Sequence, residues 1–170
     1  MLLTLTRHRW NLPLVAHLGA SGEDSFNDLA ETMRISRDSL SRSLDALKDS
    51  GLILRSESGR VVYALTTKGR RMAPPCTEVL DLARTREIEE LALRRWTLPI
   101  AIVLENWSLR FNELKAALPE ITPRALALAL KDMDAAGLVS REIVGGFPPA
   151  ASYKLTEAGV LFLPALARLN

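Results

Sequence analysis

The sequence predicts a mainly α-helical fold with small two-stranded hairpins (α+β), in which one structural unit occurs twice in tandem. Two observations support this prediction. Residues that are typical of helix starts and helix ends recur in the same order in both halves of the chain. The 170 residues are 48% hydrophobic and 25% charged, which is enough apolar material for two domains of about 85 residues each.

The repeat is found by aligning the chain with itself. Apolar residues match at helical or strand spacing, and the last matched threonine of each copy is followed three residues later by a glycine, Gly69 or Gly159. One fold is therefore encoded twice. The matched pairs are Arg9 to Pro13 with Arg95 to Pro99, Phe26 to Leu29 with Phe111 to Leu114, Ile35, Leu40, Leu44, Leu47, Gly51 and Leu52 with Ile121, Leu126, Leu130, Met133, Gly137 and Leu138, and Tyr63 to Thr66 with Tyr153 to Thr156.

The first helix of each copy is expected near Pro13 or Pro99, because proline is tolerated in a first helical turn, where its missing N–H has no helical partner. Asn11 and Thr97 are the expected N-caps of these helices.

Hydroxyl side chains also place the next two helices. The second helix is expected to start after Ser25 in one copy and after Ser108 in the other. The third is expected to start after Ser36 or Thr122, with Pro123 at its first position. An apolar stripe with i, i+4, i+7 spacing predicts the buried face of the third helix, and a glycine should end it. These residues are Leu40, Leu44, Leu47 and Gly51, and Leu126, Leu130, Met133 and Gly137.

Two strands and a closing helix complete each copy. Thr66 and Thr156 are expected to cap the closing helices. The predicted strands are 52–56 and 61–65, joined around residues 58–60, and 138–144 and 152–155, joined around residues 145–149.

The copies are joined by residues 77–94, which have helical apolar spacing and contain no glycine, serine or proline. We expect them to form a connecting helix rather than a flexible linker. Pro74 and Pro75 should break the preceding helix. The predicted domains are therefore residues 1–76 and 95–170.

A helix, a helix-turn-helix and a two-stranded wing in this order make a winged helix-turn-helix domain. Because fusion holds the second domain at high effective concentration, the two are expected to pack as a pseudo-dimer within one chain. Further homo-oligomerisation is left open.

Several function classes are not supported. The single cysteine, Cys76, excludes an internal disulfide, and two histidines without metal-ligand spacing predict no metal. No nucleophile triad, glycine-rich phosphate loop or paired-carboxylate motif is present, so we expect no enzyme activity and no cofactor. Apolar runs such as residues 98–104 are too short to span a membrane, and the start of the chain lacks a signal-peptide pattern. A cytoplasmic protein is expected.

A set of motifs runs through nearly the whole second copy, with a looser match in the first copy: Arg95 to Thr97, Arg110 to Leu114, Ile121 to Arg124, Gly137 to Val139, Pro148 to Tyr153 and Leu155 to Gly159. Through these motifs the second copy resembles the HxlR family of winged-helix transcription regulators of bacteria and archaea. Trp10 and Trp96 lack the preceding cysteine that many members use for sensing. The resemblance implies a regulator that binds double-stranded DNA at the nucleoid; members usually carry one domain and act as homodimers, whereas this chain fuses two.

The expected DNA-binding residues of the first domain lie on its third helix and its wing. A recognition helix enters the major groove with its N-terminal half, so side chains near the helix start reach base edges or phosphates. Wing cations are expected to contact phosphates without reading sequence. The helix residues are Ser36, Arg37, Asp38, Ser41 and Arg42, and the wing residues are Arg55, Arg60 and, more weakly, Lys68.

The second domain offers fewer cations. Its third helix presents Arg124, Leu128 and Lys131, and its wing, residues 144–151, carries no charge. Residues 1–86 carry a net charge of +3 and residues 87–170 a net charge of −1. Since phosphate binding needs positive charge at the contact, this domain is expected to bind DNA weakly or to meet a protein partner.

Two alternatives remain open in the sequence. A tandem winged-helix chain can also serve as a scaffold or assembly subunit that binds proteins. A small effector pocket between the domains is compatible with DNA binding and leaves no sequence signal.

Overall fold

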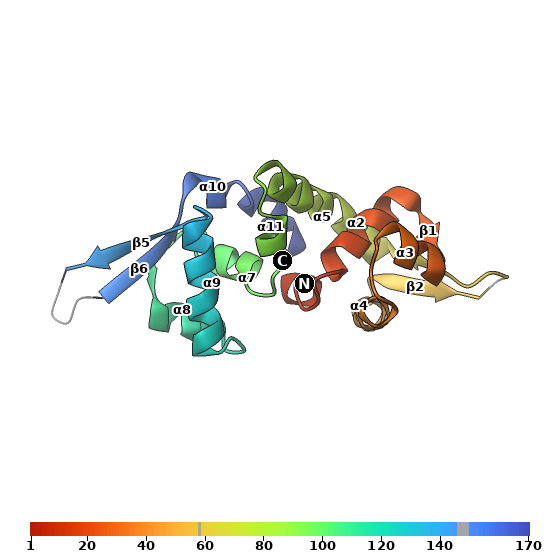
Figure 1. Ribbon diagram of the computed structural model, residues 1–170, viewed down its shortest axis with the longest axis horizontal. Coiled ribbons are helices and arrows are strands. Elements are labelled where there is room, and N and C mark those ends of the chain that lie inside the picture. Colours follow the sequence, from red (N-terminus) through yellow and green to blue (C-terminus); the bar gives the residue numbers. More distant parts are fainter. Residues whose placement is uncertain (58, 146–149) are drawn as a thin grey trace.

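The computed structural model describes residues 1–57, 59–145 and 150–170. Two units of the same topology lie at opposite ends of an elongated molecule, with their hairpins pointing away from each other (Figure 1). The first unit consists of α1 (Leu2–Leu5), α2 (Asn11–Ser21), β1 (Glu23–Asp24), α3 (Phe26–Thr32), α4 (Arg37–Asp49), β2 (Ile53–Ser56), β3 (Val62–Leu65) and α5 (Thr67–Thr85). The second consists of α6 (Glu89–Ala92), α7 (Thr97–Val103), β4 (Leu109–Arg110), α8 (Phe111–Ala117), α9 (Pro123–Ala135), β5 (Val139–Val144), β6 (Ala150–Leu155), α10 (Glu157–Val160) and α11 (Leu163–Leu169).

The predicted helix-turn-helix elements are confirmed in both units. Ser36 accepts a hydrogen bond from the backbone N–H of Ser39 at 3.4 Å, and Thr122 accepts the equivalent bond at the start of α9. The glycines that end α4 and α9, Gly51 and Gly137, have φ angles of 69° and 67°. Both apolar stripes are buried, which orients the opposite face of each helix toward solvent.

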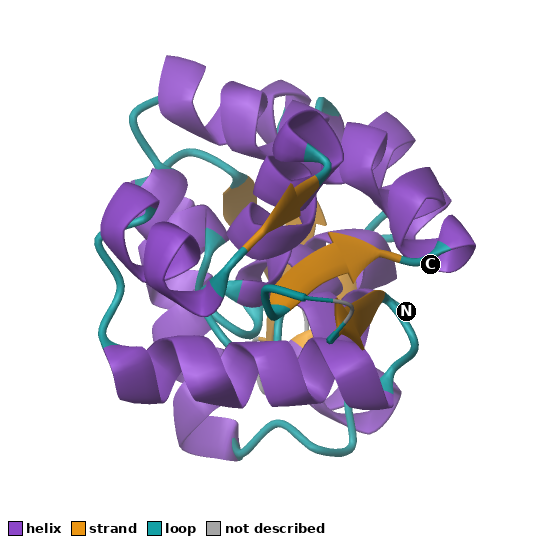
Figure 2. Ribbon diagram, turned by 90° about the vertical axis from the view of Figure 1, so that its right-hand side faces the viewer, coloured by secondary structure: helices purple, strands orange, loops and turns teal. Residues whose placement is uncertain are grey.

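Each wing contains one more strand than the sequence predicted. β1 pairs antiparallel with β3, and β4 pairs antiparallel with β6, so that the sheet orders are β1-β3-β2 and β4-β6-β5. In the first unit these strands lie among the helices that pack around them (Figure 2). Two-residue strands have no periodicity that a sequence pattern can reveal, which is why they were missed.

The glycine that follows each capping threonine has a packing role. A Cβ atom at Gly69 would lie 2.0 Å from the backbone oxygen of Leu52, and one at Gly159 would lie 2.2 Å from that of Leu138. α5 and α10 therefore approach the backbone just before β2 and β5 so closely that a side chain at this position has no space.

The expected break at Pro74 and Pro75 is wrong. α5 continues through both prolines to Thr85, so residues 77–94 are not a separate connecting helix. The two prolines remove hydrogen bonds only to the carbonyls of Arg70 and Arg71, which are exposed residues whose carbonyls water can solvate. The helix ends where Glu87 takes a φ of 57°, and α6 follows as a separate short helix.

Three further expectations about helix starts are corrected. Asn11 and Thr97 are the first residues of α2 and α7 rather than their N-caps. Their side chains instead donate back to the preceding segment, to the carbonyls of Thr4 and Leu91, at 2.7 Å in each case. The second helix of the second unit starts after Arg110, not after Ser108.

The two units pack through their closing helices. α5 contacts α11, and the ion pair between Arg168 and Glu78 joins the same two helices. α1 contacts both α4 of the first unit and α7 of the second, and an ion pair joins Arg9 to Glu90 of α6. The buried side chains form one hydrophobic core across both units, as a pseudo-dimer within one chain requires.

No helix in residues 1–57, 59–145 and 150–170 has both the length and the apolar character needed to cross a bilayer.

Candidate nucleic-acid interface

The first recognition helix, α4, presents a polar face to solvent. Ser36, Arg37, Asp38, Ser41 and Arg42 are all exposed, and they occupy its N-terminal half. This is the part of a recognition helix that reaches base edges in the major groove. The structure thus brings together all five residues that the sequence placed on this helix.

The two arginines of this face are held by neighbouring groups. Arg37 donates from Nη2 to the side-chain oxygen of Asn27 at 2.9 Å, and its guanidinium lies over the ring of Phe26. Arg42 donates from Nε to the backbone oxygen of Asp38 at 3.2 Å. Each arginine keeps further N–H groups, since a guanidinium carries five donors.

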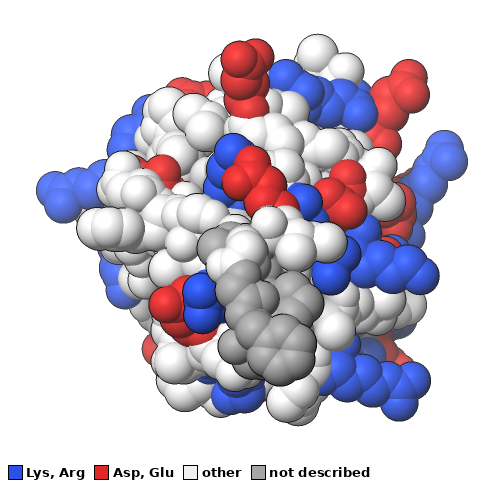
Figure 3. All heavy atoms as spheres, turned by 90° about the vertical axis from the view of Figure 1, so that its left-hand side faces the viewer, with Lys and Arg blue, Asp and Glu red and all other residues white. Residues whose placement is uncertain are grey.

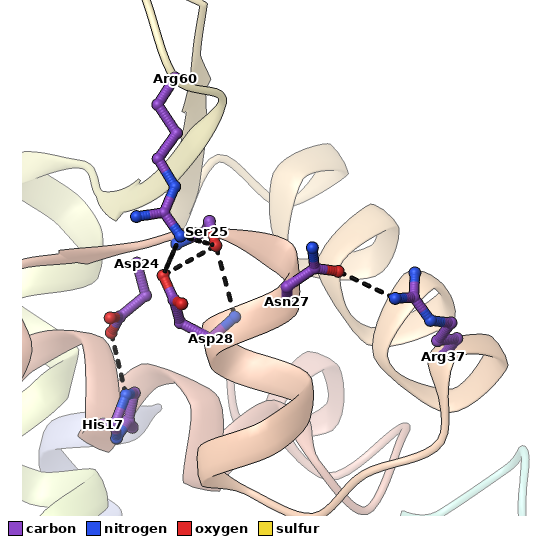
Figure 4. A network of polar contacts seen from close by, with 7 residues as sticks. All are labelled: His17, Asp24, Ser25, Asn27, Asp28, Arg37 and Arg60. Carbon is purple, nitrogen blue, oxygen red and sulfur yellow. Dashed lines mark hydrogen bonds and ion pairs between the residues drawn. The ribbon is translucent and has the colours of Figure 1, made fainter.

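The wing arginine Arg60 folds back onto the start of α3 (Figure 4). Its Nη2 lies 2.7 Å from a carboxylate oxygen of Asp28 and 2.8 Å from the hydroxyl of Ser25. Hydrogen bonds from Ser25, together with the charge of Arg60, lower the pKa of Asp28. The wing is thereby tied to the helix-turn-helix, and a phosphate bound by Arg60 has to compete with Asp28.

The remaining cations of the first wing are also paired. Arg55 forms an ion pair with Glu57 on the same wing. Lys68, the weakest candidate, donates to the carbonyl of Ser50 at 2.9 Å and so satisfies the C-terminal end of α4. Lys68 therefore positions the recognition helix rather than extending the wing surface.

The second recognition helix, α9, offers a sparser polar face. Arg124 and Lys131 are exposed, and neither forms an ion pair with a described residue. Between them Leu128 is 55% exposed. Asp132 on the same helix forms an ion pair with Arg94, which lies between α6 and α7.

Half of the uncharged wing of the second domain (residues 144–151), namely residues 146–149, lies outside the described residues. Its stem is described and carries Arg141, an exposed cation that the sequence analysis did not select. Beside it Lys154 pairs with Glu142 across the two strands. From this end of the molecule, cations and anions are interspersed among uncharged side chains (Figure 3).

The sequence profile of the HxlR-like helix-turn-helix family matches this chain twice, over residues 5–90 and over residues 91–170. The chain belongs to the HxlR-like family. The boundary between the two HxlR-like matches falls in α6, after α5 has ended.

Individual proteins similar to this chain are described as HTH-type transcriptional regulators. YvaP of Bacillus subtilis, an HTH-type transcriptional regulator, is 32% identical over 87 residues, which are 51% of this chain and 81% of YvaP. An HTH-type transcriptional regulator of Methanothermobacter thermautotrophicus is 35% identical over 75 residues, 44% of this chain and 57% of that protein. The solved structure of the reduced transcriptional regulator YodB from B. subtilis is 27% identical, with a TM-score of 0.46, over 51% of this chain and 84% of YodB.

Cys76 of this HxlR-like chain is fully buried in α5. Burial raises the pKa of its thiol to about 12, so the thiol is protonated at neutral pH. A protonated, buried thiol is a poor nucleophile. The positions before Trp10 and Trp96 carry no cysteine either.

Sequence reasoning missed a group of basic residues at the junction of the two HxlR-like units. Arg7 and His8 follow α1, and Arg95 precedes α7. Burial lowers the pKa of His8, and the charges of Arg7, Arg42 and Arg95 lower it further. Arg7 and His8 are far from Arg42 and Arg95 in the sequence, so only the folded chain brings these groups together.

Proposed function

We propose that this chain regulates transcription by binding duplex DNA as a covalently linked pair of winged helices. In this proposal α4 and α9 enter major grooves about one turn of DNA apart, because two-fold paired helix-turn-helix units bind half-sites at that spacing. Membership of the HxlR-like family and the solvent-facing polar residues of both helices support the proposal.

The exposed faces of α4 and α9 differ in their side chains, and this difference predicts the kind of DNA site that the chain prefers. α4 presents Arg37, Ser41 and Arg42. α9 has exposed Leu128 between its two cations, and leucine offers only apolar contact, for example to a thymine methyl group. An arginine that pairs with guanine contributes about 1–3 kcal/mol of base discrimination. The preferred DNA site should therefore be non-palindromic, with most specificity in the half bound by α4.

A salt-dependent binding measurement tests DNA binding itself. Fluorescence anisotropy with duplexes from the upstream region of the protein's own gene should detect binding at about 50 mM salt. With about four to six cations in contact with phosphates, log K should fall against log[salt] with a slope of about −4 to −6. Absence of binding to every duplex under these conditions would contradict the proposal and favour a protein-binding role.

Two matched double variants test the asymmetry. Arg37→Ala with Arg42→Ala should abolish discrimination between specific and unrelated duplexes. Arg124→Ala with Lys131→Ala removes the same number of positive charges and should weaken binding less. Both are measured at one salt concentration, with far-UV circular dichroism melting curves to confirm that each variant is folded. Equal losses from the two variants would rule out an asymmetric site.

A further inference from the structure

The connection between α1 and α2 brings basic residues to the junction of the two domains. α1 contacts α4 on one side and α7 on the other, and the N-terminus lies between the two halves of the molecule in Figure 1. Arg7, Arg42 and Arg95 all act electrostatically on His8. Arg7, Arg42 and Arg95 therefore lie near His8. These basic groups come from three separate segments: the α1–α2 connection, α4 and the residues before α7.

An open groove of about 580 Å³ lies at this junction. Arg7 and Arg95 line it together with Asp49, near the end of α4, and Glu120, in the turn before α9. Arg95 is bound to Glu120 at 2.8 Å. Arg7 and Arg42 form no ion pair with any residue in the described part of the chain. Of the two arginines that line the groove, Arg7 therefore lacks a partner carboxylate in the described part of the chain.

We propose that the α1–α2 connection, through Arg7 and His8, is a third DNA-binding element that holds the DNA backbone between the segments bound by α4 and α9. The inference rests on the proposed function, because Arg42 of α4 is both a proposed DNA contact and a neighbour of His8. DNA that reaches Arg42 passes close to this junction.

The chemistry of the site matches a phosphate diester. The like charges of Arg7, Arg42 and Arg95 around His8 repel one another, and a phosphate between them relieves that repulsion. The guanidinium of Arg7 can bind two phosphate oxygens at once. In the free protein these positive charges also disfavour protonation of His8. A phosphate beside His8 brings negative charge and therefore favours protonation.

DNA binding through this element should therefore take up a proton. The groups that act on His8 are Arg7, Arg42 and Arg95, with the carboxylates Asp49 and Glu120 on the adjoining groove. The pKa of His8 is lowered in the free protein and rises when an anion binds. Affinity should then increase as pH falls through the interval between these two pKa values.

Hydroxyl-radical footprinting and salt titration of the full chain on a bound duplex test the inference. The wild-type protein should protect two flanking segments and the backbone between them. Arg7→Gln should lose protection of the central segment only, and its salt slope should be less negative by about 0.9, the value for one phosphate contact. The matched control is Arg86→Gln, which removes an exposed cation at the C-terminal end of α5. Its footprint and salt slope should equal those of the wild type.

A second readout uses pH. Between pH 7.5 and pH 6.0 the wild-type protein should gain affinity, and His8→Gln should lose that gain while keeping the flanking footprints. Flanking protection with an exposed centre, or an Arg7→Gln variant with the wild-type slope and footprint, overturns this inference and leaves the proposed function standing. Absence of any footprint contradicts the proposed function itself.

Discussion

At the scale of single residues, two glycines show why the repeat is so regular. Gly69 of α5 and Gly159 of α10 lie where these helices touch the backbone just before β2 and β5. The preceding threonines complete the contact, since Thr66 donates to the carbonyl of Gly51 at 2.7 Å and accepts from the N–H of Gly69 at 3.1 Å. The start of α5 thereby contacts both the residue before β2 and the C-terminal end of α4. These contacts set the position of the wing relative to α4.

Gly69→Ala should destabilise the protein, because the added Cβ would have to displace backbone rather than a flexible side chain. We expect a loss of about 1–3 kcal/mol in the free energy of unfolding, measured by urea denaturation. Gly145→Ala is the control, since a Cβ there meets nothing within 4 Å and the backbone does not have a positive φ. Equal stability of the two variants would show that the helix–strand contact is looser than the structure indicates.

The buried thiol gives a second prediction at this scale. Because the pKa of Cys76 is about 12, the folded protein should react negligibly with iodoacetamide at pH 8, and the urea-unfolded protein should react fully. Mass spectrometry of the alkylated chain measures both. Treatment with diamide should leave DNA binding unchanged, and a diamide-sensitive footprint would contradict an inert role for Cys76.

At the scale of elements, the ends of α3, α4, α5 and α9 share one backbone geometry but not one residue type. α4 and α9 end with a glycine at positive φ, whereas the turn before α4 and the end of α5 use Arg34 and Glu87, with φ of 51° and 57°. After Glu87 the N–H of Ile88 donates back to the carbonyl of Ala83, closing the end of the helix. Because glycine is absent there, the sequence offered no stop signal at the true end of α5.

Glu87→Gly should stabilise the protein. A non-glycine residue in the left-handed region loses about 1–2 kcal/mol, and the greater freedom of glycine in the unfolded chain offsets about 0.5–1 kcal/mol of that. The net gain should raise the thermal unfolding midpoint by a few degrees. Glu87→Ala removes the same carboxylate but keeps the strained backbone, so it should show no such gain, and equal midpoints for the two variants would contradict the explanation.

At the scale of the whole molecule, the chain packs two HxlR-like units against each other within one polypeptide. α5 and α11 meet at the centre, α1 lies against both units, and ion pairs from Arg9 and Arg168 cross between them. Fusion removes the requirement that both units be identical, which lets the two recognition faces differ.

Cutting the chain after Arg86 tests this arrangement. A protease site inserted between Arg86 and Glu87 would be cleaved in the folded protein, leaving α5 attached to the first unit. Because α5 and α11 bury apolar residues against each other, the fragments should elute together in size-exclusion chromatography and separate only in denaturant. Elution as two independent fragments in native buffer would contradict a pseudo-dimer held by its closing helices.

The sequence by itself determined the repeated unit, the helix-turn-helix with its capping residues, the wings and the exposed face of α4. These features depend on local rules of capping, turn formation and apolar periodicity, which the chain carries residue by residue. Tertiary structure alone decided whether α5 passes through Pro74 and Pro75, because packing on α2 and α11 outweighs the lost hydrogen bonds. It also decided that Arg60 binds Asp28 within the first unit, and that Arg7, His8 and Arg42 meet Arg95 of the second unit. Charged side chains far apart in sequence find their neighbours only in the folded chain.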